Sequence, residues 1–402
     1  MTARFLIVGG IYQERCIQPL WNAVFGSAGR AVYCVAPLVK SEIELHAYVA
    51  DGIKDEANHL AADCGVRLVP SSAEQAIGFD YLHPLSIPII RPAVARIARL
   101  PAIHVSGDVV LRYGMLEGDA VVEAKIAVYD PQSAFGAPRF SANGSRADRL
   151  AIVMNRMEAQ SMTGLADPEA AARSLIESGE AQVVIVKQGG KGALIATPEG
   201  IDRIPYYRTE RVWKLGSGDV FSATFAALWG ANSVPPRDAA DLASRATAAY
   251  CGNRALPPPA IDELRAMRNE PVEPGSGLIY LAGPFFDIGQ RWLIEEARGL
   301  LLSLGARVFS PIHEVGPGPA SVVAPEDIAG LEQADAVLAI ANGLDPGTIF
   351  EIGYAVKLGI PIVVLAQTVK DEDLKMIAGN GCEITDDFAS ALYRVVGRLP
   401  TL

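Results

Sequence analysis

The sequence predicts two α/β domains, each built on a mostly parallel sheet. The chain has 402 residues, which is more than one ordinary domain holds. Short apolar runs typical of strands alternate with helical patterns, and this alternation starts afresh after a stretch rich in proline and glycine. Half of the residues (50%) are apolar and 20% are charged, as in well-packed α/β domains. We therefore expect domains at residues 1–270 and 278–402, joined by a linker at residues 271–277.

The elements of the first domain follow from short apolar runs that end at glycine or polar residues. Strands are expected at residues 4–9, 31–35, 66–69, 126–132, 150–155, 183–187 and 193–196. Helices are expected at residues 51–64, at 169–177 and in the alanine-rich stretch behind Phe221. Residues 79–124 contain four prolines in irregular surroundings, so we expect loops there that reach over a cleft.

Charge and composition exclude several classes of function. The formal net charge of −11 argues against non-specific binding to a nucleic acid polymer or to an anionic membrane. No apolar run approaches the roughly 20 residues of a membrane span. The N-terminal stretch is a strand that runs into glycines, which differs from a signal peptide. The five cysteines and five histidines do not cluster, so we expect a cytoplasmic protein without structural zinc.

The stretch Gly216-Ser-Gly-Asp219 lies directly before a predicted helix and carries the chemistry of the first domain. Backbone N–H groups at such a turn point at one spot, and the helix dipole adds positive potential, so the turn binds anions. Asp219 beside it is a candidate base for the hydroxyl that accepts a phosphoryl group. The alternative is an ordinary helix N-terminus with an aspartate cap.

Three segments together resemble the ribokinase-like (PfkB) carbohydrate kinase family over about residues 2–268. They are Asn155-x-x-Glu158, Lys187-Gln-Gly189-Gly-Lys-Gly192 and the Gly216-Ser-Gly-Asp219 turn. The resemblance implies an α/β/α sandwich and a kinase that uses Mg-ATP, with Asp219 as the base. The residues it assigns to cofactor binding are Gly216, Ser217, Gly218, Lys187, Gly189, Asn155 and Glu158.

The sequence departs from that family in two places. Leu215 stands where the family has threonine, and Ser217 replaces an alanine. The Gly-Gly-x-x-x-Asn sugar motif is absent, and the closest segment is Gly26-Ser-Ala-Gly-Arg30. An arginine suits a phosphate or carboxylate better than a neutral sugar edge. A kinase-like domain that has become a ligand sensor or scaffold therefore stays open as an alternative.

The second domain reads as a flavodoxin/Rossmann-like doubly wound parallel sheet. Strands are expected at residues 278–282, 306–309, 336–341 and 361–366, with helices at 287–304, after 345, and at 386–397. Residues 310–324 are rich in glycine and proline and are expected to be a loop that borders the cleft. In such sheets ligands bind in the crevice beyond the carboxyl ends of the strands.

Two carboxylates, Asp345 and Glu351, flank the turn between the third of these strands and its helix. We expect Glu351 in the first turn of the helix, where the dipole favours the ionised form. An ionised carboxylate at a cleft mouth can attack a sugar carbon as a nucleophile. The alternative is that Glu351 caps the helix and Asp345 supports the turn.

The segment Tyr280-Leu-Ala-Gly-Pro-Phe285 and the block Asp-x-Gly-Thr-x-x-Glu-x-Gly-Tyr-Ala that starts at Asp345 resemble the nucleoside 2-deoxyribosyltransferase family. The resemblance covers about residues 277–398. It implies that Glu351 is the nucleophile, that Asp345 and Asp327, on a short helix after Pro325, assist it, and that no cofactor is needed. The residues expected to bind substrate are Tyr280, which also orients Glu351, Gly283, Pro284, Phe285, His313, Gly347 and Thr348.

Together the two resemblances predict a bifunctional protein of nucleoside or pentose salvage. One half would cleave or transfer the N-glycosidic bond of a (deoxy)nucleoside or nucleotide, and the other would phosphorylate a sugar or nucleoside with ATP and Mg²⁺. Water as the acceptor would make the second half a nucleotide N-glycosidase, because transferases and hydrolases share these motifs. We expect small-molecule substrates and a homo-oligomer.

Overall fold

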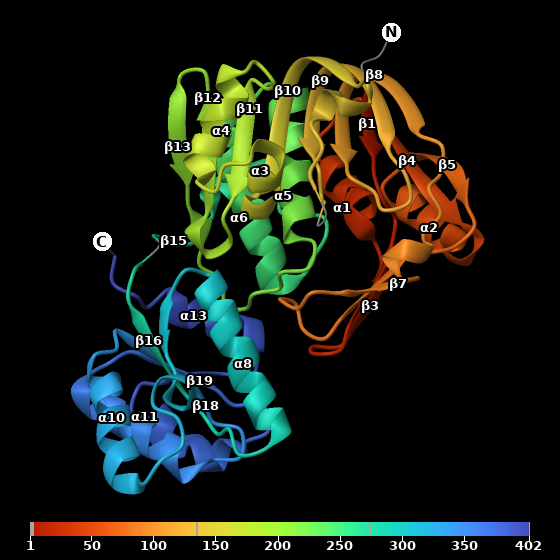
Figure 1. Ribbon diagram of the computed structural model, residues 1–402. Coiled ribbons are helices and arrows are strands. Elements are labelled where there is room, and N and C mark those ends of the chain that lie inside the picture. The colour runs from red at the N-terminus through yellow and green to blue at the C-terminus, as the bar shows by residue number, and fades with distance from the viewer. Residues whose placement is uncertain (1–3, 134–135, 274, 402) are drawn as a thin grey trace. The chain divides into compact units, whose positions relative to one another are not determined.

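The computed structural model describes residues 4–133, 136–273 and 275–401. The chain divides into two compact units, Met1–Thr209 with Trp213–Pro271 and Glu210–Val212 with Val272–Leu402. Each unit has its own sheet and its own helices (Figure 1). Among the helices of the described residues, none combines the length and the apolar character that crossing a bilayer requires.

The first unit is built on a nine-stranded sheet in the order β13-β12-β11-β10-β9-β8-β1-β4-β5. The seven strands from β5 to β11 are parallel to one another, whereas β12 is antiparallel to both of its neighbours, β11 and β13. The bounds are β1 (Arg4–Val8), β4 (Glu42–Ala50), β5 (Arg67–Ala73), β8 (Ile103–Tyr113), β9 (Ala120–Asp130), β10 (Arg146–Asn155), β11 (Val183–Lys187), β12 (Ala193–Thr197) and β13 (Gly200–Ile204).

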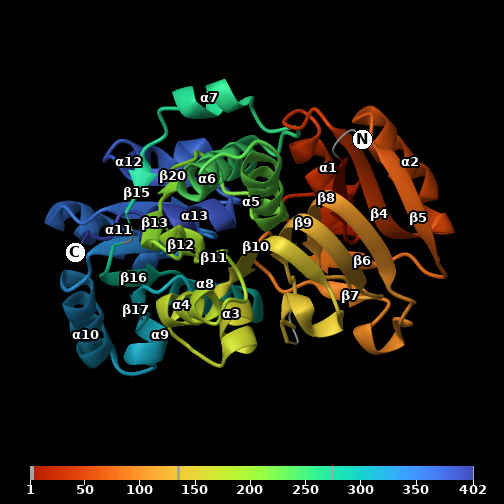
Figure 2. The same ribbon diagram turned by 90° about the horizontal axis from the view of Figure 1, so that it is seen from above.

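Helices cover both faces of this sheet, which confirms the predicted α/β/α sandwich (Figure 2). One layer holds α1 (Gly26–Val35), α2 (Lys54–Asp63), α5 (Ser217–Phe225) and α6 (Pro236–Asn253), and the other holds α3 (Arg156–Thr163) and α4 (Pro168–Glu177). On the central strand β1, Phe5 and Ile7 pack into the first layer and Leu6 and Val8 into the second. A strand buried on both faces reads as a continuous apolar run, and this run made β1 predictable.

A second, four-stranded sheet in the same unit has the order β3-β2-β6-β7. Its strands are β2 (Gln13–Cys16), β3 (Trp21–Val24), β6 (Gly78–Tyr81) and β7 (Ile89–Arg91). Glu14 lies opposite Phe79, and Phe79 lies opposite Ile90, so these three side chains share one face. The remaining elements of the unit are η1 (Asp51–Ile53), η2 (Val94–Arg96), η3 (Phe140–Asn143), η4 (Gly189–Lys191), β14 (Tyr206–Tyr207), the π-helical η5 (Ala226–Ala231) and α7 (Ile261–Ala266).

One sequence-based expectation for this unit is wrong. Residues 31–35 were expected to form a strand but are the second half of α1, whose side chains are nearly all buried. A five-residue apolar run does not distinguish a buried strand from a buried helix. Residues 79–124 include loops, as expected, and they also hold most of β6, all of β7 and β8 and the start of β9. The prolines of this region fall between the strands and do not interrupt them.

The second unit is a five-stranded sheet in the order β17-β16-β18-β19-β20, with every pairing parallel. Its strands are β16 (Leu278–Ala282), β17 (Arg307–Phe309), β18 (Ala336–Ile340), β19 (Ile362–Leu365) and β20 (Glu383–Thr385). Numbered within the unit, this order is 2-1-3-4-5, the flavodoxin-like arrangement. The predicted doubly wound sheet is therefore confirmed. Its topological switch point lies between β16 and β18.

The helices of the second unit connect the strands around that switch point. They are α8 (Ile288–Ser303), α9 (Pro311–Glu314), α10 (Ala320–Glu332), α11 (Pro346–Leu358), η6 (Asp371–Leu374), α12 (Lys375–Ala378) and α13 (Phe388–Val396), after the short β15 (Pro271–Val272). The expected loop at residues 310–324 instead contains α9 and the first turn of α10. Pro325 lies inside α10, because a different proline, Pro319, is the N-cap of that helix.

Candidate active sites

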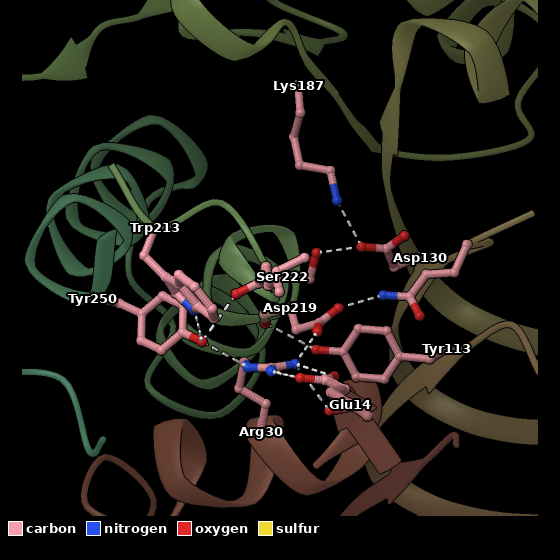
Figure 3. Close-up of polar contacts among 12 residues, drawn as sticks. Glu14, Arg30, Tyr113, Asp130, Lys187, Trp213, Asp219, Ser222 and Tyr250 are labelled. Carbon is pink, nitrogen blue, oxygen red and sulfur yellow. Dashed lines mark hydrogen bonds and ion pairs between the residues drawn. The ribbon is translucent and has the colours of Figure 1, made fainter. Parts of the chain in front are cut away.

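Polar residues lie at the carboxyl ends of four adjacent parallel strands of the first unit, and Figure 3 shows Tyr113, Asp130 and Lys187 among them. Tyr113 ends β8 and lies beside Asp130 at the end of β9. Asn155 ends β10 and lies beside Lys187 at the end of β11. This edge is where parallel sheets bind ligands.

The N-terminus of α5 supplies a site for an anion at this edge. Gly216 precedes the helix with a φ of 71°, a left-handed conformation that glycine adopts without strain. No side chain caps the helix start. A Cβ placed on Gly218 would lie 3.3 Å from Lys187 Nζ, so the ammonium group stands directly beside the turn. Helix dipole and ammonium together favour a negatively charged group here.

Lys187 is held in place by a buried carboxylate. Its Nζ lies 2.7 Å from Asp130 Oδ2, and Ser222 Oγ donates to the same oxygen at 2.6 Å. Burial lowers the pKa of Lys187, but Asp130 and Glu158 more than offset this effect, so its pKa is raised and the group stays charged. Gly189 opens η4 just beyond Lys187, at the same edge of the sheet.

Asn155 and Glu158 form a capping box at the start of α3. The Asn155 side chain accepts from the Glu158 N–H at 2.9 Å, and Glu158 Oε2 accepts from the Asn155 N–H at 2.7 Å. Burial, followed by the charge of Asp130, raises the pKa of Glu158 to about 7. Among the described residues no group of three acidic, histidine or cysteine side chains could hold a metal ion. Asn155 and Glu158 carry oxygen atoms of the kind that Mg²⁺ takes as ligands, and phosphate oxygens and water would supply most of the others.

Asp219 lies at the start of α5 with both carboxylate oxygens engaged. Arg30 Nη1 donates to Oδ2 at 2.8 Å, and Gln132 Nε2 donates to Oδ1 at 2.5 Å. The Tyr113 hydroxyl donates to the main-chain carbonyl of Asp219 at 3.0 Å. Burial raises the pKa of Asp219 to about 6, although Arg30 opposes this shift.

Arg30 is completely buried and its donors are used within the protein. It forms an ion pair with Glu14, and its Nη1 also reaches Asp219 and the Gly26 carbonyl. Its Nε donates to the Tyr250 hydroxyl at 3.1 Å. The expectation that Arg30 suits a phosphate or carboxylate of the substrate is therefore wrong, since two internal carboxylates neutralise it.

A cavity of about 580 Å³ opens between α1, α5 and the small sheet. Gly216, Gly218 and Asp219 line it on one side, together with Ser27 and Gln132. The side chains from the small sheet and its loops are Tyr12, Glu14, Phe79, Tyr81, Ile87, Pro88, Ile90 and Val94, with Leu116 beside them. The proposed base and the anion site thus face a pocket of the size that holds small molecules.

In the second unit the structure brings Tyr280 and Glu351 together. Tyr280, on β16, donates its hydroxyl to Glu351 Oε1 at 2.6 Å. The ring of Tyr280 is fully buried and stacks on Phe309, with centroids 5.4 Å apart and planes 12° from parallel. Stacking and burial fix the hydroxyl, so it can hold the carboxylate in one orientation.

Glu351 lies in the second turn of α11, not in the first, because the helix begins at Pro346. The dipole effect falls off within the first turn, so it does not ionise this carboxyl as expected. The pKa of Glu351 is instead raised to about 7, chiefly by burial. The hydrogen bond from Tyr280 opposes this rise, and the charges of Asp327 and Asp345 add to it.

The two assisting aspartates differ in their surroundings. Asp345 is the N-cap of α11, and its Oδ2 accepts from the N–H of Thr348 at 2.8 Å and from its hydroxyl at 3.0 Å. Asp327 lies on α10, and burial raises its pKa. Its Oδ1 is buried and has no hydrogen-bond partner within the described part of the chain. An unpaired carboxylate oxygen of this kind is suited to a ligand.

Apart from Tyr280 and His313, the expected substrate-binding residues fall into two groups. Gly283, Pro284 and Phe285 follow the end of β16, and Gly347 and Thr348 form the start of α11, so both groups lie at strand ends around the switch point. Thr348 is buried and binds Asp345, which makes it part of the cap.

His313 is engaged at both ring nitrogens. Nδ1 lies 3.0 Å from Ser310 Oγ, and Nε2 lies 2.9 Å from Glu295 Oε2. The sequence-based expectation was a hydrogen bond to backbone or substrate, and the structure gives two side-chain partners instead.

Comparisons with known proteins confirm both family resemblances. Residues 279–386 match the family model of nucleoside 2-deoxyribosyltransferases, and residues 149–257 match that of pfkB family carbohydrate kinases. No curated protein matches the chain.

Solved structures confirm the fold of the first unit. A ribokinase from Thermotoga maritima is 17% identical with a TM-score of 0.50 and covers 66% of this chain and 98% of its own. A nucleoside kinase from Methanocaldococcus jannaschii, a member of the ribokinase family, is 14% identical with a TM-score of 0.50 and covers 66% and 97%. The first unit therefore has a ribokinase-like fold, and the chain joins it to a deoxyribosyltransferase-like unit.

Sequence reasoning missed the partners of the predicted residues. Glu14, Gln132, Asp130, Ser222 and Tyr250 come from four separate segments of the chain. Four of them contact Arg30, Asp219 or Lys187, and Ser222 donates to Asp130 Oδ2. For Asp130 one signal existed, because it ends an apolar strand at the predicted sheet edge.

Proposed function

We propose that the second unit cleaves or transfers the N-glycosidic bond of a (deoxy)nucleoside or nucleotide, with Glu351 as the nucleophile. The observation that carries this proposal is the 2.6 Å hydrogen bond between the buried Tyr280 hydroxyl and Glu351 at the switch point of the sheet. The match to nucleoside 2-deoxyribosyltransferases over residues 279–386 supports it.

In the proposed reaction Glu351 Oε2, the oxygen not bonded to Tyr280, attacks C1′ of the sugar. The bond between C1′ and the base nitrogen breaks, its electrons leave with the base, and Asp327 in its protonated form supplies the proton. A glycosyl ester on Glu351 results, and a second base or water then releases the sugar. The raised pKa of Asp327 supports its role as a proton donor.

Product analysis tests this proposal and separates transfer from hydrolysis. The purified chain is incubated with 2′-deoxynucleosides and nucleotides, with and without an added free base, and the products are identified by mass spectrometry. Transfer predicts new nucleosides only when a second base is added, whereas hydrolysis predicts free sugar in both cases. Absence of base release from every substrate would contradict the proposal.

We propose for the first unit a phosphoryl transfer from Mg-ATP to a hydroxyl of a sugar or nucleoside. Asp219 takes the proton of the hydroxyl as its oxygen attacks the γ-phosphorus, and ADP leaves. The backbone at Gly216–Gly218 and the Lys187 ammonium stabilise the charge on the transferring group. Proximity of Lys187 to this turn supports the assignment.

One observation favours a second candidate, in which this unit binds a ligand without phosphorylating it. Arg30 and Gln132 donate to the two carboxylate oxygens of Asp219 and compete there with the hydroxyl of an acceptor. Turnover of ATP across a panel of nucleosides and pentoses decides between the two. Binding without ADP formation favours the sensor.

A further inference from the structure

The cavity of the first unit presents an apolar, aromatic wall from the small sheet. Phe79 and Tyr81 lie on one face of β6 with stacked rings, 6.5 Å apart and 17° from parallel. Tyr12 packs on Phe79 at 5.2 Å, and Ile90 lies directly opposite Phe79 on β7. Binding of a flat apolar group against this wall is favourable because it buries apolar surface, and a heteroaromatic ring stacks well on it.

Other residues that line the cavity are polar and suited to hydroxyl groups. Ser27 Oγ, on the first turn of α1, is buried and has no hydrogen-bond partner among the residues that the structure describes. Leaving a buried hydroxyl unpaired costs free energy, and a ligand that reaches it removes that cost. The Asp219 carboxylate and the Gln132 amide line the same cavity.

Away from the anion site at Gly216–Gly218, beside which Lys187 stands, the charges around the cavity select against an anionic ligand. Glu14 and Asp219 both line it, while the described lining contains no lysine, arginine or histidine. Arg30 lies behind these carboxylates, completely buried, and offers its donors to them. A phosphate or carboxylate would thus meet two carboxylates and only a neutralised cation.

We propose that this cavity binds a neutral nucleoside, with its base against Phe79, Tyr81 and Ile90 and its sugar hydroxyls toward Ser27 and Asp219. The nucleoside would be the acceptor of the proposed kinase reaction. Its phosphorylation rests on that proposal, whereas its binding does not. Free pentoses leave the aromatic wall uncovered, and nucleotides or sugar phosphates carry the wrong charge.

Calorimetric titration of the full chain carrying Glu351→Gln tests the binding. This substitution keeps the second unit from consuming the ligand. The probes are inosine and thymidine, ribose, ribose 5-phosphate and the two nucleoside 5′-monophosphates. Phe79→Ala should weaken nucleoside binding at one site about 10- to 100-fold. Ile90→Trp should abolish it by filling the cavity. Leu20→Ala is the matched control, since Leu20 is 86% exposed in the loop between β2 and β3 and does not line the cavity.

A parallel assay of ADP formation with Mg-ATP separates this inference from the kinase proposal. If Phe79→Ala weakens nucleoside binding but no ADP forms, the kinase proposal is wrong and the inference about nucleoside binding holds. Phosphorylation of ribose or ribose 5-phosphate in preference to nucleosides overturns the inference and leaves the kinase. The inference is also wrong if the parent, Phe79→Ala and Ile90→Trp bind nucleosides equally well and both variants melt at the same temperature as Leu20→Ala.

Discussion

Arg30 Nη1 lies 2.8 Å from Asp219 Oδ2, so the proposed catalytic base of the first unit belongs to a buried ion pair. Glu14 binds the same guanidinium, which gives two carboxylates to one cation. Such a cluster is stable only while the cation is present, because each carboxylate is desolvated and repels the other. The same arrangement explains why Arg30 is unavailable to a ligand and why the cavity in front of it prefers a neutral one.

Replacing Arg30 by methionine should destabilise the first unit strongly. Breaking a buried ion pair by removing one partner costs about 3–5 kcal/mol. Denaturant unfolding followed by circular dichroism measures the loss. Arg173→Met is the control, because Arg173 forms an exposed i,i+4 pair with Glu169 that contributes at most about 0.5 kcal/mol. Equal losses in the two variants would contradict the role given to Arg30.

Asp219→Asn should abolish phosphoryl transfer and leave nucleotide binding largely intact, since the backbone of Gly216–Gly218 holds the anion. In the parent, transfer should fall as the pH drops below about 6, because the pKa of Asp219 is raised to about 6 and the protonated acid takes no further proton. Initial rates of ADP formation across pH measure both effects. Asp202→Asn, on the exposed face of β13, is the control. Undiminished turnover in Asp219→Asn would remove this residue from the mechanism.

The strand ends were predictable from sequence because buried parallel strands are short apolar runs that stop at polar residues. Lys187 ends β11 as expected, Tyr280 lies inside β16, and Asp219 and Glu351 lie in the first and second turns of α5 and α11. Side-chain partners from distant segments were not predictable. Arg30 and Asp219 are 189 positions apart, and no local pattern couples them. The helix boundary at Pro346 also escaped prediction, and it decides whether the dipole acts on Glu351.

The division of the chain predicts two independently folding pieces. Fragments 1–270 and 275–402 should each be soluble and melt cooperatively, because each unit has its own sheet and its own buried core. Differential scanning calorimetry of both fragments and of the full chain measures this. Aggregation of both fragments beside a stable full chain would mean that the boundary is misplaced or that the units need each other to fold.

Tyr280→Phe should shift the pH dependence of base release. The Tyr280 hydroxyl lowers the pKa of Glu351, so its removal moves that pKa above its present value of about 7. The deprotonated carboxylate is the nucleophile, and the acid limb of the pH–rate profile should therefore move to higher pH. At pH 7 we expect a loss of about 10- to 100-fold, the worth of one hydrogen bond to a charged group.

Tyr354→Phe is the matched control for this shift. Its hydroxyl donates to Glu332 at 2.6 Å and lies on the same helix as Glu351. An unchanged profile is expected in this variant. An equal shift of the pH–rate profile in both variants, or a shift in neither, would show that the Tyr280 hydroxyl does not set the pKa of Glu351.

The strongest test of the second unit is Glu351→Gln, which keeps the shape of the side chain and removes its nucleophilic charge. Base release from a 2′-deoxynucleoside should fall by at least about 10³-fold, and no glycosyl adduct should be trapped. Asp345→Asn should cost less, since Asp345 mainly caps α11.

A second measurement on Glu351→Gln concerns stability. The native state binds the Glu351 proton more tightly than the unfolded chain does, because the pKa rises from 4.5 to about 7 on folding. The free energy of unfolding therefore drops as the pH rises from 4.5 to 7. Glu351→Gln should remove that drop, so the variant should melt above the parent at pH 8 and close to it at pH 4. Cleavage at the parental rate by a variant with this stability profile would show that Glu351 is buried as described and is not the nucleophile.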